Sequence, residues 1–491
     1  MGKLNLIAFD LGASNGRAIH GSFDGERIVM DELHRFETPV VNLNGMLYWD
    51  APGLFASMKE GIAKFASLKK GELHGFGIDT WGVDYGLLDK NGRLLGLPRS
   101  YRAATDEYMN ATHQVVPQRT LFSRTGINAM SYNTAYQLFR RKQEEDGALN
   151  AAKTLLFMPD LLGYFLTGEI ATEFTIATTS MLYDGKGGDW SRETIKELGL
   201  PDIFTAVQKS GERRGTLLPS ICDELGINAA TLCTVGEHDT ASAVAAIPGE
   251  GDFAFCSSGT WSLFGVENDL PRMDEAAYDG GFSSEGTVQG GFRTLKSIMG
   301  MWLIQECRRE WNKEGRNYSW DAIVAEAQKV RPFRTVLDVD HPTFYTAGNM
   351  PEKIREYCRM TGQKEPVSVG QFARCIYESL ALKYCYAVEK LEEMKGRPLS
   401  SLNIVGGAIQ NKFLNQMVAD ATQRPVAVGP IEGAAMGNLL MQAVALGELK
   451  DIHEVRQVVR RCVDVTYYTP GEAGPWQDAY GKLKELMKKE A

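Results

Sequence analysis

The chain has 491 residues, of which 44% are hydrophobic and 23% are charged, and its formal net charge is −9. This length is too great for one ordinary hydrophobic core, so we expect two or three domains. The acidic balance argues against a dedicated nucleic-acid or membrane-surface binder, which would carry a basic patch. Phosphate ligands stay possible, because backbone amides and a few side chains are enough to hold them.

The start of the chain and its cysteines are typical of a cytoplasmic protein. "MGKLNLIAFDLG" predicts a strand and a turn, without the basic segment and apolar run of a signal peptide. No window approaches about 18 uninterrupted apolar residues, so we expect no membrane span. The eight cysteines include no Cys-x-x-Cys pair, which favours free thiols over a zinc site.

The first half of the chain predicts strands joined by tight turns. "LNLIAFDLGAS" is a strand ending in a glycine turn, and the Asp24-Gly25 pair after it is a strong hairpin signal. An amphipathic helix is expected from Ala51 to Leu68. "HGFGIDTWGVDYGLLDKNG" then predicts strand, loop, strand and turn, and helices are expected to dominate from Tyr108 to Leu166.

The same pattern restarts in the second half. "GDFAFCSSGTWSLFGVEND" again predicts strand, turn and strand. "SLNIVGGAIQNKFLNQMVADAT" and "RPVAVGPIEGAAMGNLLMQAVALG" each predict strand, glycine turn and helix. The halves therefore resemble each other as α/β domains, and we expect a boundary near Ile247-Pro248-Gly249, giving domains of residues 1–246 and 247–491.

The turn "DLGASNGR", residues 10–17, has the composition of an anion site. Its glycines permit a backbone that presents consecutive N–H groups, and Ser14, Asn15 and Arg17 add donors suited to phosphate oxygens. Asp10, at the end of the strand, is a candidate for holding Mg²⁺ through water. The loop is not a Walker A motif, because Gly-Lys-Ser/Thr is absent. An ordinary hairpin turn is the alternative.

Two turns in the second half have related compositions. "CSSGTWS" places three hydroxyl side chains around Gly259, without an acid corresponding to Asp10. Two such turns facing each other across a cleft would hold a triphosphate from both sides. In "VGGAIQN", Gly406 and Gly407 would let a nucleotide lie against the backbone between a strand and a helix. A plain connecting turn is the alternative for this pair.

A further motif, "VGEHDTASAVAA", opens an Ala-rich helix. Asp239 in this motif has two interpretations. Asp is a favoured helix N-cap and its charge suits the positive end of a helix, whereas a carboxylate in such a loop can also be a catalytic base. The stretch alone favours the cap.

Taken in order, these motifs resemble the FGGY family of carbohydrate kinases, and within it the branch that acts on L-rhamnulose. The resemblance rests on "AFDLGASNGR", "GIDTWGVDYGLLD", "GLPRSYR", "GEHDTASAV", "SSGTWSL", "LKSIMGMWLIQE" and "VGGAIQN". It implies two α/β domains of the ribonuclease H-like type, as in actin and Hsp70, with an active-site cleft between them that closes. It also implies transfer of the γ-phosphoryl group of MgATP to O1 of a 6-deoxy-ketohexose.

The resemblance changes the interpretation of Asp239, which matches the catalytic base of the family. A carboxylate is ionised at pH 7 and can accept the proton of the attacking hydroxyl late, as the bond to phosphorus forms. The base and cap roles are compatible. His238 is expected to contact sugar hydroxyls, and Thr240 is expected either to do the same or to cap the helix.

The other functional residues also follow from the resemblance. Asp84 is expected to accept hydrogen bonds from the sugar, and Trp81 either packs on its C6 methyl group or belongs to the core. The remaining expected sugar contacts are Gly82 and Ser297. The expected ATP contacts are Ala13, Ser14, Asn15, Gly16, Arg17, Thr260, Gln305, Gly406 and Gly407. Asp10 stays the candidate for Mg²⁺, and no nucleic acid or membrane partner is expected.

Two positions depart from the pattern of the rhamnulose branch. Ala103 occupies a position where that branch has Asp, and Ser297 replaces an Asn that contacts the substrate. A shorter side chain loses a hydrogen-bond donor and some reach, and such losses alter specificity. L-Fuculose differs from L-rhamnulose at C4, so a fuculokinase or a kinase for both sugars is the alternative. An actin- or Hsp70-like ATP switch is a more distant one. The sequence leaves the oligomeric state open.

Overall fold

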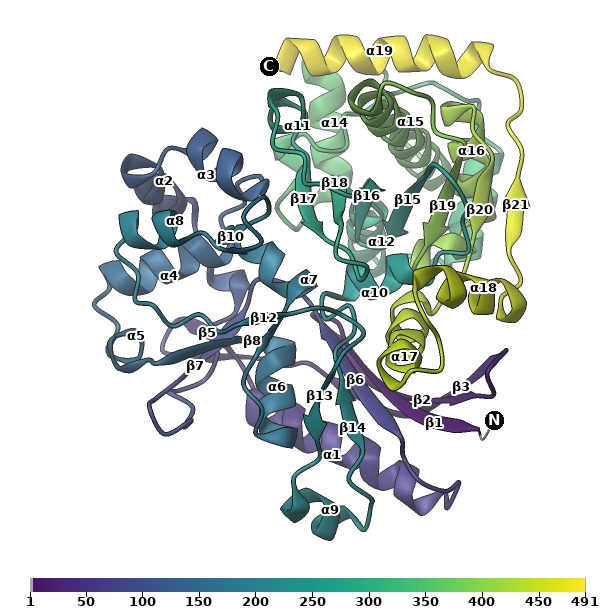
Figure 1. Cartoon of the computed structure of the whole chain (residues 1–491). Coiled ribbons are helices and arrows are strands. Elements are labelled where there is room, and N and C mark those ends of the chain that lie inside the picture. The colour runs from purple at the N-terminus through teal and green to yellow at the C-terminus, as the bar shows by residue number, and fades with distance from the viewer. Residues whose placement is uncertain (1–2, 491) are drawn as a thin grey trace. The chain divides into compact units, whose positions relative to one another are not determined.

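The computed structural model describes residues 3–490, which form two compact units. Unit 1 comprises Met1–Pro248, Glu267–Thr294 and Glu432–Val463. Unit 2 comprises Gly249–Val266, Leu295–Ile431 and Asp464–Ala491. Two segments of the second half of the sequence therefore fold with the first half (Figure 1).

Unit 1 is built on a six-stranded mixed sheet in the order β13-β14-β6-β1-β2-β3. β1, β2 and β3 form an antiparallel meander, with the predicted Asp24-Gly25 hairpin between β2 and β3. β6 runs parallel to β1, and β14 runs parallel to β6. The strands are β1 (Leu4–Leu11), β2 (Asn15–Phe23), β3 (Ile28–Glu37), β6 (Gly75–Thr80), β13 (Arg213–Thr216) and β14 (Thr231–Cys233).

Helices cover both faces of this sheet. The predicted helix is confirmed as α1 (Ala51–Ser67), which begins after Asp50, whose carboxylate accepts a hydrogen bond from the Gly53 N–H at 3.0 Å. The other helices of unit 1 are α2 (Asp106–Val115), α3 (Gln118–Thr125), α4 (Thr134–Gln143), α5 (Gly147–Ala151), α6 (Met158–Thr167), α7 (Phe174–Ala177), α8 (Arg192–Glu197), α9 (Pro219–Leu225), α10 (Asp239–Ala245), α11 (Glu275–Asp279), α17 (Gly433–Leu446) and α18 (Ile452–Cys462).

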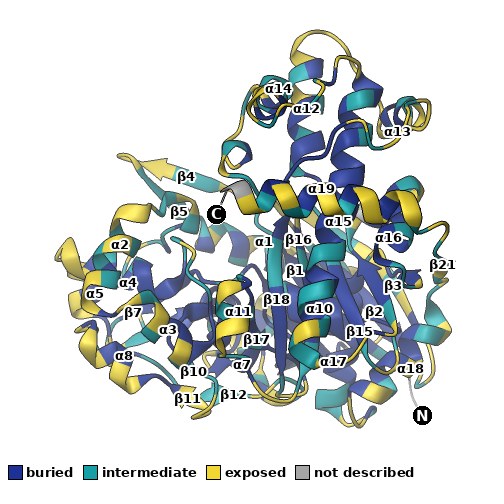
Figure 2. Cartoon of the chain, turned by 90° about the horizontal axis from the view of Figure 1, so that it is seen from above, coloured by how far each residue is buried: buried dark blue, intermediate teal, exposed yellow. Residues whose placement is uncertain are grey.

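The alternation of side chains along β1 separates two layers of core. Ile7 and Phe9 pack with residues of α1, α6 and α9 on one face. Leu6 and Ala8 pack with residues of α10, α17 and α18 on the other, and β1 is buried on both (Figure 2). Asp10 continues the second set, because successive residues of a strand alternate between faces. Its side chain therefore belongs to the face that α10 and α17 cover.

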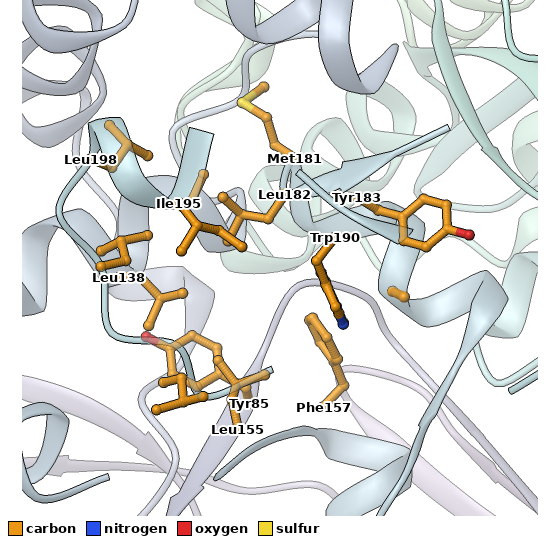
Figure 3. Packing of buried hydrophobic residues seen from close by; sticks show 14 of the residues in the cluster. Tyr85, Leu138, Leu155, Phe157, Met181, Leu182, Tyr183, Trp190, Ile195 and Leu198 are labelled. Carbon is orange, nitrogen blue, oxygen red and sulfur yellow. The ribbon is translucent and has the colours of Figure 1, made fainter. Parts of the chain in front are cut away.

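A separate hydrophobic cluster supports the helical part of unit 1. Figure 3 shows Trp190, Phe157 and Tyr183 within this cluster, and all three side chains are buried. The Trp190 ring stacks on Phe157 at 6.3 Å between centroids and meets Tyr183 edge to face. The short strands here and nearby are β4 (Val40–Leu43), β5 (Met46–Trp49), β7 (Tyr85–Leu88), β8 (Thr154–Phe157), β9 (Thr172–Glu173), β10 (Tyr183–Asp184), β11 (Asp189–Trp190) and β12 (Val207–Gln208).

The second sheet repeats the arrangement of the first. Its order is β17-β18-β16-β15-β19-β20-β21, with β15 and β16 antiparallel and β19 and β20 parallel to β15. β17 and the adjoining ends of β16 and β18 are counted with unit 1. The strands are β15 (Phe253–Ser258), β16 (Trp261–Asn268), β17 (Ser283–Gly286), β18 (Phe292–Met299), β19 (Ser401–Val405), β20 (Val426–Val428) and β21 (Thr466–Tyr468).

The longest helix of unit 2 is α15, with 27 residues from Val369 to Lys395. The Ser368 hydroxyl caps its start, and Gly396, in the left-handed conformation, ends it. The other helices of unit 2 are α12 (Trp302–Lys313), α13 (Trp320–Gln328), α14 (Met350–Met360), α16 (Lys412–Thr422) and α19 (Gly474–Glu490). Within residues 3–490, no helix combines the length and apolarity that a bilayer span needs. The eight cysteines are free thiols, as expected.

Candidate active site

Three carboxylates gather where β1 and β6 end and α10 begins. Asp10 and Asp79 are register partners on these parallel strands, so their side chains leave the same face of the sheet. The N–H of Thr80 donates to the carbonyl of Glu237 at 2.9 Å, which places the segment before Asp239 along β6. Burial raises the pKa of Asp79 well above its usual range, and the charges of Asp10 and Asp239 raise it further.

Asp239 is the first residue of α10, and His238 occupies the N-cap position. No side chain caps this helix, so the prediction that Asp239 or Thr240 caps it is wrong. The Thr240 hydroxyl instead donates to Asp239 Oδ1 at 3.1 Å. The Asp239 side chain is 34% exposed, which leaves its carboxylate accessible to a ligand.

Arg17 links the turn after β1 to the start of α17. Its guanidinium donates to Asp10 Oδ2 at 2.6 Å and forms an ion pair with Glu432. The turn closes with a hydrogen bond from the Gly12 N–H to the Asn15 carbonyl at 2.9 Å. The side chains of Ser14 and Asn15 are exposed, Ala13 is half-buried and Gly16 is buried. The predicted phosphate loop therefore presents its tip to solvent with one charged side chain at its base.

Asp79 also bears on the predicted Mg²⁺ site. Its Oδ2 accepts a hydrogen bond from Asn438 Nδ2 at 2.6 Å, whereas Oδ1 is buried without a hydrogen-bond partner. A buried carboxyl oxygen without a donor, beside Asp10, fits a hydrated cation. Over the residues that the structure describes, no three acidic, His or Cys side chains are placed to hold a metal by themselves. A Mg²⁺ ion at Asp10 would therefore need phosphate oxygens and water as its other ligands.

The Asp84 carboxylate organises the predicted sugar loop. Its Oδ2 accepts hydrogen bonds from Trp49 Nε1 at 2.5 Å, Trp81 Nε1 at 3.1 Å and the Tyr101 N–H at 3.1 Å. Its Oδ1 accepts from Gln137 Nε2 at 3.0 Å. Burial raises the pKa of Asp84 to about 6, although all of these donors favour the ionised form. This carboxylate thus already has four protein donors.

The residues between Trp81 and Asp84 are held in an unusual conformation. Trp81 is buried against Trp49, with 4.0 Å between ring centroids, so core packing accounts for its position. Val83 has a φ of 69°, a left-handed value that is rare for a β-branched residue. The Thr179 hydroxyl accepts a hydrogen bond from the Val83 N–H at 3.1 Å and holds this backbone. Such strained backbone is concentrated at ligand-binding sites.

His238 lies beside two charged side chains that the sequence analysis did not identify. Its Nδ1 is 3.2 Å from Glu285 Oε2 and 3.2 Å from Arg293 Nη2. Both residues come from the β17–β18 hairpin, more than forty residues after His238 in the sequence. No local motif marks them, so only the fold reveals their proximity.

A buried ionic network supports the Glu237-His238 segment from another side. The Glu173 carboxylate accepts a hydrogen bond from the Glu237 N–H at 3.3 Å. Arg214 Nη1 lies 2.7 Å from Asp160 Oδ1 and 3.2 Å from Glu237 Oε1. Burial raises the pKa of Glu237 well above its usual range, despite the Arg214 charge. This network fixes the backbone that presents His238, and the sequence analysis missed its members.

The predicted nucleotide residues of unit 2 lie at two places, one around Thr260 and one around Gly406. Thr260 Oγ1 donates to Gln305 Oε1 at 3.0 Å, so these two predicted ATP contacts are adjacent. Gly406 has a φ of 91°, and a Cβ atom there would lie 2.7 Å from the Ser258 carbonyl oxygen. Only glycine fits this close approach to the end of β15. Gly407 follows at the start of a short 3₁₀ helix, Gly407–Gln410.

The predicted sugar residues do not all belong to one unit. Ser297 is half-buried on β18 and is counted with unit 2, whereas Gly82, Asp84 and His238 belong to unit 1. Ala103 ends a short 3₁₀ helix, and its carbonyl accepts a hydrogen bond from Arg140 Nη1 at 2.7 Å.

Comparison with known proteins agrees with this geometry. The N-terminal domain of the FGGY family of carbohydrate kinases matches residues 5–246, and its C-terminal domain matches residues 254–446. The chain is 38% identical to a rhamnulokinase of Bacteroides thetaiotaomicron over 99% of this chain and 100% of that protein. It is 37% identical to a rhamnulokinase of Bacillus subtilis over 94% and 95% of the two chains.

Solved structures show the same fold. A xylulose kinase of Rhodospirillum rubrum superimposes with a TM-score of 0.83 at 16% identity, covering 99% of this chain and 98% of that one. A glycerol kinase of Plasmodium falciparum gives a TM-score of 0.79 at 13% identity, with 99% and 98% covered. The predicted two-domain α/β fold is thereby confirmed as that of the sugar-kinase structures, and the chain belongs to the FGGY family of carbohydrate kinases.

Proposed function

We propose that this chain is an ATP-dependent kinase that phosphorylates L-rhamnulose at O1, giving L-rhamnulose 1-phosphate. Its rhamnulokinase relatives match it over nearly their whole length, which supports the substrate. The observation that carries the mechanism is the accessible Asp239 carboxylate, beside Asp10 and Asp79 and hydrogen-bonded by Thr240.

In this proposal Asp239 accepts the proton of the sugar O1 hydroxyl as O1 attacks the γ-phosphorus. Phosphoryl transfer has a loose transition state, so the protein contributes mainly by positioning groups and compensating charge. Arg17 and the N–H groups of residues 13–16 bind phosphate oxygens. His238, Thr240, Gly82 and Ser297 bind the sugar directly. The Asp84 carboxylate and Trp81 hold the loop around Gly82 and contribute to the wall of the sugar site.

The nucleotide part of the proposal rests on unit 2. Thr260 and Gln305 contact ATP, and the close approach at Gly406 and Gly407 leaves room for the nucleoside. Mg²⁺, held by Asp10 through water, neutralises phosphate charge when it is bound. The cytoplasm as the compartment is part of the same proposal.

The test is ADP release with MgATP and three ketoses: L-rhamnulose, L-fuculose and L-ribulose. Clear preference for L-rhamnulose supports the proposal and means that Ala103 and Ser297 are tolerated differences. Preference for L-fuculose means that these two positions change the specificity of the sugar site for the configuration at C4. The substrate assignment is then wrong. Release of ADP that no ketose stimulates contradicts the kinase function itself.

A Ser297→Asn variant refines this test, because it restores the longer amide side chain of the rhamnulose branch. If Ser297 contacts the sugar, the ratio of kcat/KM for L-rhamnulose to that for L-fuculose changes by about tenfold. The matched control is Ser284→Asn. Ser284 lies on the neighbouring strand β17, and its hydroxyl bonds to the Arg272 backbone. Equal ratios in both variants contradict a sugar contact at position 297.

A further inference from the structure

Glu237, two residues before the proposed base Asp239, belongs to a group of three buried carboxyl side chains in unit 1. The other two are Asp160 on α6 and Glu173 on β9, and all three residues are at most 2% exposed. In the described part of the chain, the charges that act most strongly on Glu237 are those of Arg214, Asp160 and Glu173. Three buried carboxyl groups thus lie around one guanidinium.

The hydrogen-bond donors of this group go to Glu173 and Asp160. Glu173 Oε2 accepts from the Thr175 hydroxyl at 2.6 Å. Asp160 Oδ1 accepts from Arg214 Nη1 at 2.7 Å and from the Glu173 N–H at 3.1 Å. Glu237 Oε1 has a longer contact of 3.2 Å with Arg214, and among residues 3–490 no N–H or hydroxyl group donates to its buried Oε2. Because an ionised carboxylate without donors is costly to bury, Glu237 is the group that keeps its proton.

A protonated Glu237 needs an acceptor, and Asp160 provides one. Asp160 Oδ2 is also buried and receives no N–H or hydroxyl donor from the described residues. Burial raises the pKa of both groups, and the hydrogen bond between them acts to raise the pKa of Glu237 and to lower that of Asp160. Two ionised carboxylates have no proton to share. Glu237 is therefore the donor and Asp160 the acceptor.

The backbone of Glu237 is part of the segment that presents Asp239. The Glu237 N–H donates to the Glu173 carboxylate at 3.3 Å, and the Glu237 carbonyl accepts from the Thr80 N–H at 2.9 Å. Loss of the Glu237 proton would add a negative charge beside those of Asp160 and Glu173, and these like charges repel. The repulsion would act on the segment that carries the proposed base.

We propose that Glu237 is a positioning residue, which stays protonated at neutral pH, donates to Asp160 and thereby holds in place the segment that leads into Asp239. Its role in catalysis rests on the proposed kinase function, whereas its protonation does not. Ionisation of Glu237 at alkaline pH releases the segment and lowers turnover.

The first test observes the proton and needs no substrate. Infrared spectra are recorded at neutral pH on protein labelled with ¹³C in its glutamate carboxyl groups, which separates protonated glutamates from protonated aspartates. We expect a C=O band of a protonated glutamate that disappears in Glu237→Gln. A band that stays in this variant, or a wild type without such a band, overturns the proposal.

Asp160→Asn tests the shared proton without removing a glutamate. The Asn amide can donate to Glu237 instead of accepting from it, so Glu237 can ionise beside Arg214. We expect this variant to lose at neutral pH the same band that Glu237→Gln loses. Retention of the band in a folded variant means that Asp160 does not share the proton, which overturns the proposal.

Glu378→Gln is the matched control. Glu378 is 1% exposed against 2% for Glu237, but both of its carboxyl oxygens have donors, Arg374 Nε at 2.5 Å and the Phe333 N–H at 2.8 Å. The protonated glutamate band should stay unchanged in this variant. An equal loss in both Gln variants means that burial alone keeps glutamates protonated, which overturns the specific role of Glu237.

The last test links the proton to turnover of the ketose. The kcat of the wild type should drop to about half at the pH where half of the infrared band is lost, because half of Glu237 has then ionised. Glu237→Gln keeps a donor toward Asp160 and cannot ionise, so it should show no such drop at that pH. A drop in both proteins overturns the positioning role. If no ketose is phosphorylated, the proposed function fails, while the infrared result still decides whether Glu237 holds the proton.

Discussion

The turn after β1 and the turn after β15 occupy equivalent places in two similar sheets, yet they carry different chemistry. Each closes with one short backbone hydrogen bond, from Gly12 to Asn15 at 2.9 Å and from Gly259 to Trp261 at 3.0 Å. The first turn starts from Asp10, which is paired with a guanidinium. The second turn is flanked by serine hydroxyls that contact a buried tyrosine hydroxyl.

The parallel strands beside β1 and β15, which are β6 and β19, also end in different kinds of residue. β6, next to β1, ends near Asp79, a buried carboxyl group whose pKa is raised well above its usual range by burial and by the charges of Asp10 and Asp239. β19, next to β15, ends at Val405, and Gly406 directly after it lies close to the backbone of Ser258. A shared topology therefore leaves function to the residues at the strand ends. In the proposed function, unit 1 supplies the carboxylate that accepts the proton, and unit 2 supplies glycines and hydroxyls that contact the nucleotide.

The largest expected effect comes from removing the proposed base of unit 1, Asp239. Asp239→Asn should lower kcat by about 10²–10⁴-fold, the usual contribution of a general base. The amide keeps the size of the side chain, so sugar binding measured by calorimetry should stay within a few-fold of the wild type. Full turnover in this variant contradicts the assignment of Asp239.

The next effect tests the charge of the first turn. Arg17→Met removes the proposed phosphate donor and leaves Asp10 without its partner, so kcat/KM for MgATP should fall by about 10²-fold. Arg35→Met is the control, because Arg35 forms an exposed ion pair with Glu32 on β3 of the same sheet. Equal kinetics for the two variants mean that Arg17 is only a surface charge.

A smaller effect is expected at the second sheet. Gly406→Ala introduces a Cβ atom against the Ser258 carbonyl in a left-handed conformation, which should destabilise the protein by about 1–3 kcal/mol. It should also raise the KM for MgATP by several-fold. Gly407→Ala controls for stability, since a Cβ atom there meets nothing within 4 Å. Equal midpoints of urea unfolding for both variants contradict the strain argument.

The smallest effect concerns the pH dependence of stability. Asp84 has a pKa of about 6 in the folded protein and an ordinary value of 3.8. Between these values the unfolded chain releases the proton while the folded protein keeps it, so the free energy of unfolding falls as pH rises. Asp84→Asn removes this contribution. Urea unfolding at several pH values between 4 and 6 should show a smaller fall for the variant, and identical slopes would contradict the shifted pKa.

The sequence predicted the strands and turns that carry candidate site residues where each lies within one short stretch. The turn of residues 10–17 and the glycine turn at Gly406 each combine a strand end with small residues, and both elements are confirmed. The helix N-cap was misplaced by one residue, from His238 to Asp239, because a preference for Asp at caps is only a tendency.

Contacts between distant residues were beyond the reach of these patterns. Glu432 lies 415 residues after Arg17, and no periodicity links them. β17 is counted with unit 1 although it follows β15 in the sequence. No local sequence pattern therefore predicts that Glu285 lies close to His238. The four donors to Asp84 come from separate elements as well, so no local pattern could predict them.

One steady-state experiment tests the division of labour between the units most directly. The kcat and the KM for MgATP are measured side by side for Asp239→Asn and Thr260→Ala, with a saturating ketose. We predict a loss of kcat with little change in KM for the first variant, and a raised KM with most of kcat retained for the second. Retained kcat in Asp239→Asn, together with a lost kcat in Thr260→Ala, would contradict the account.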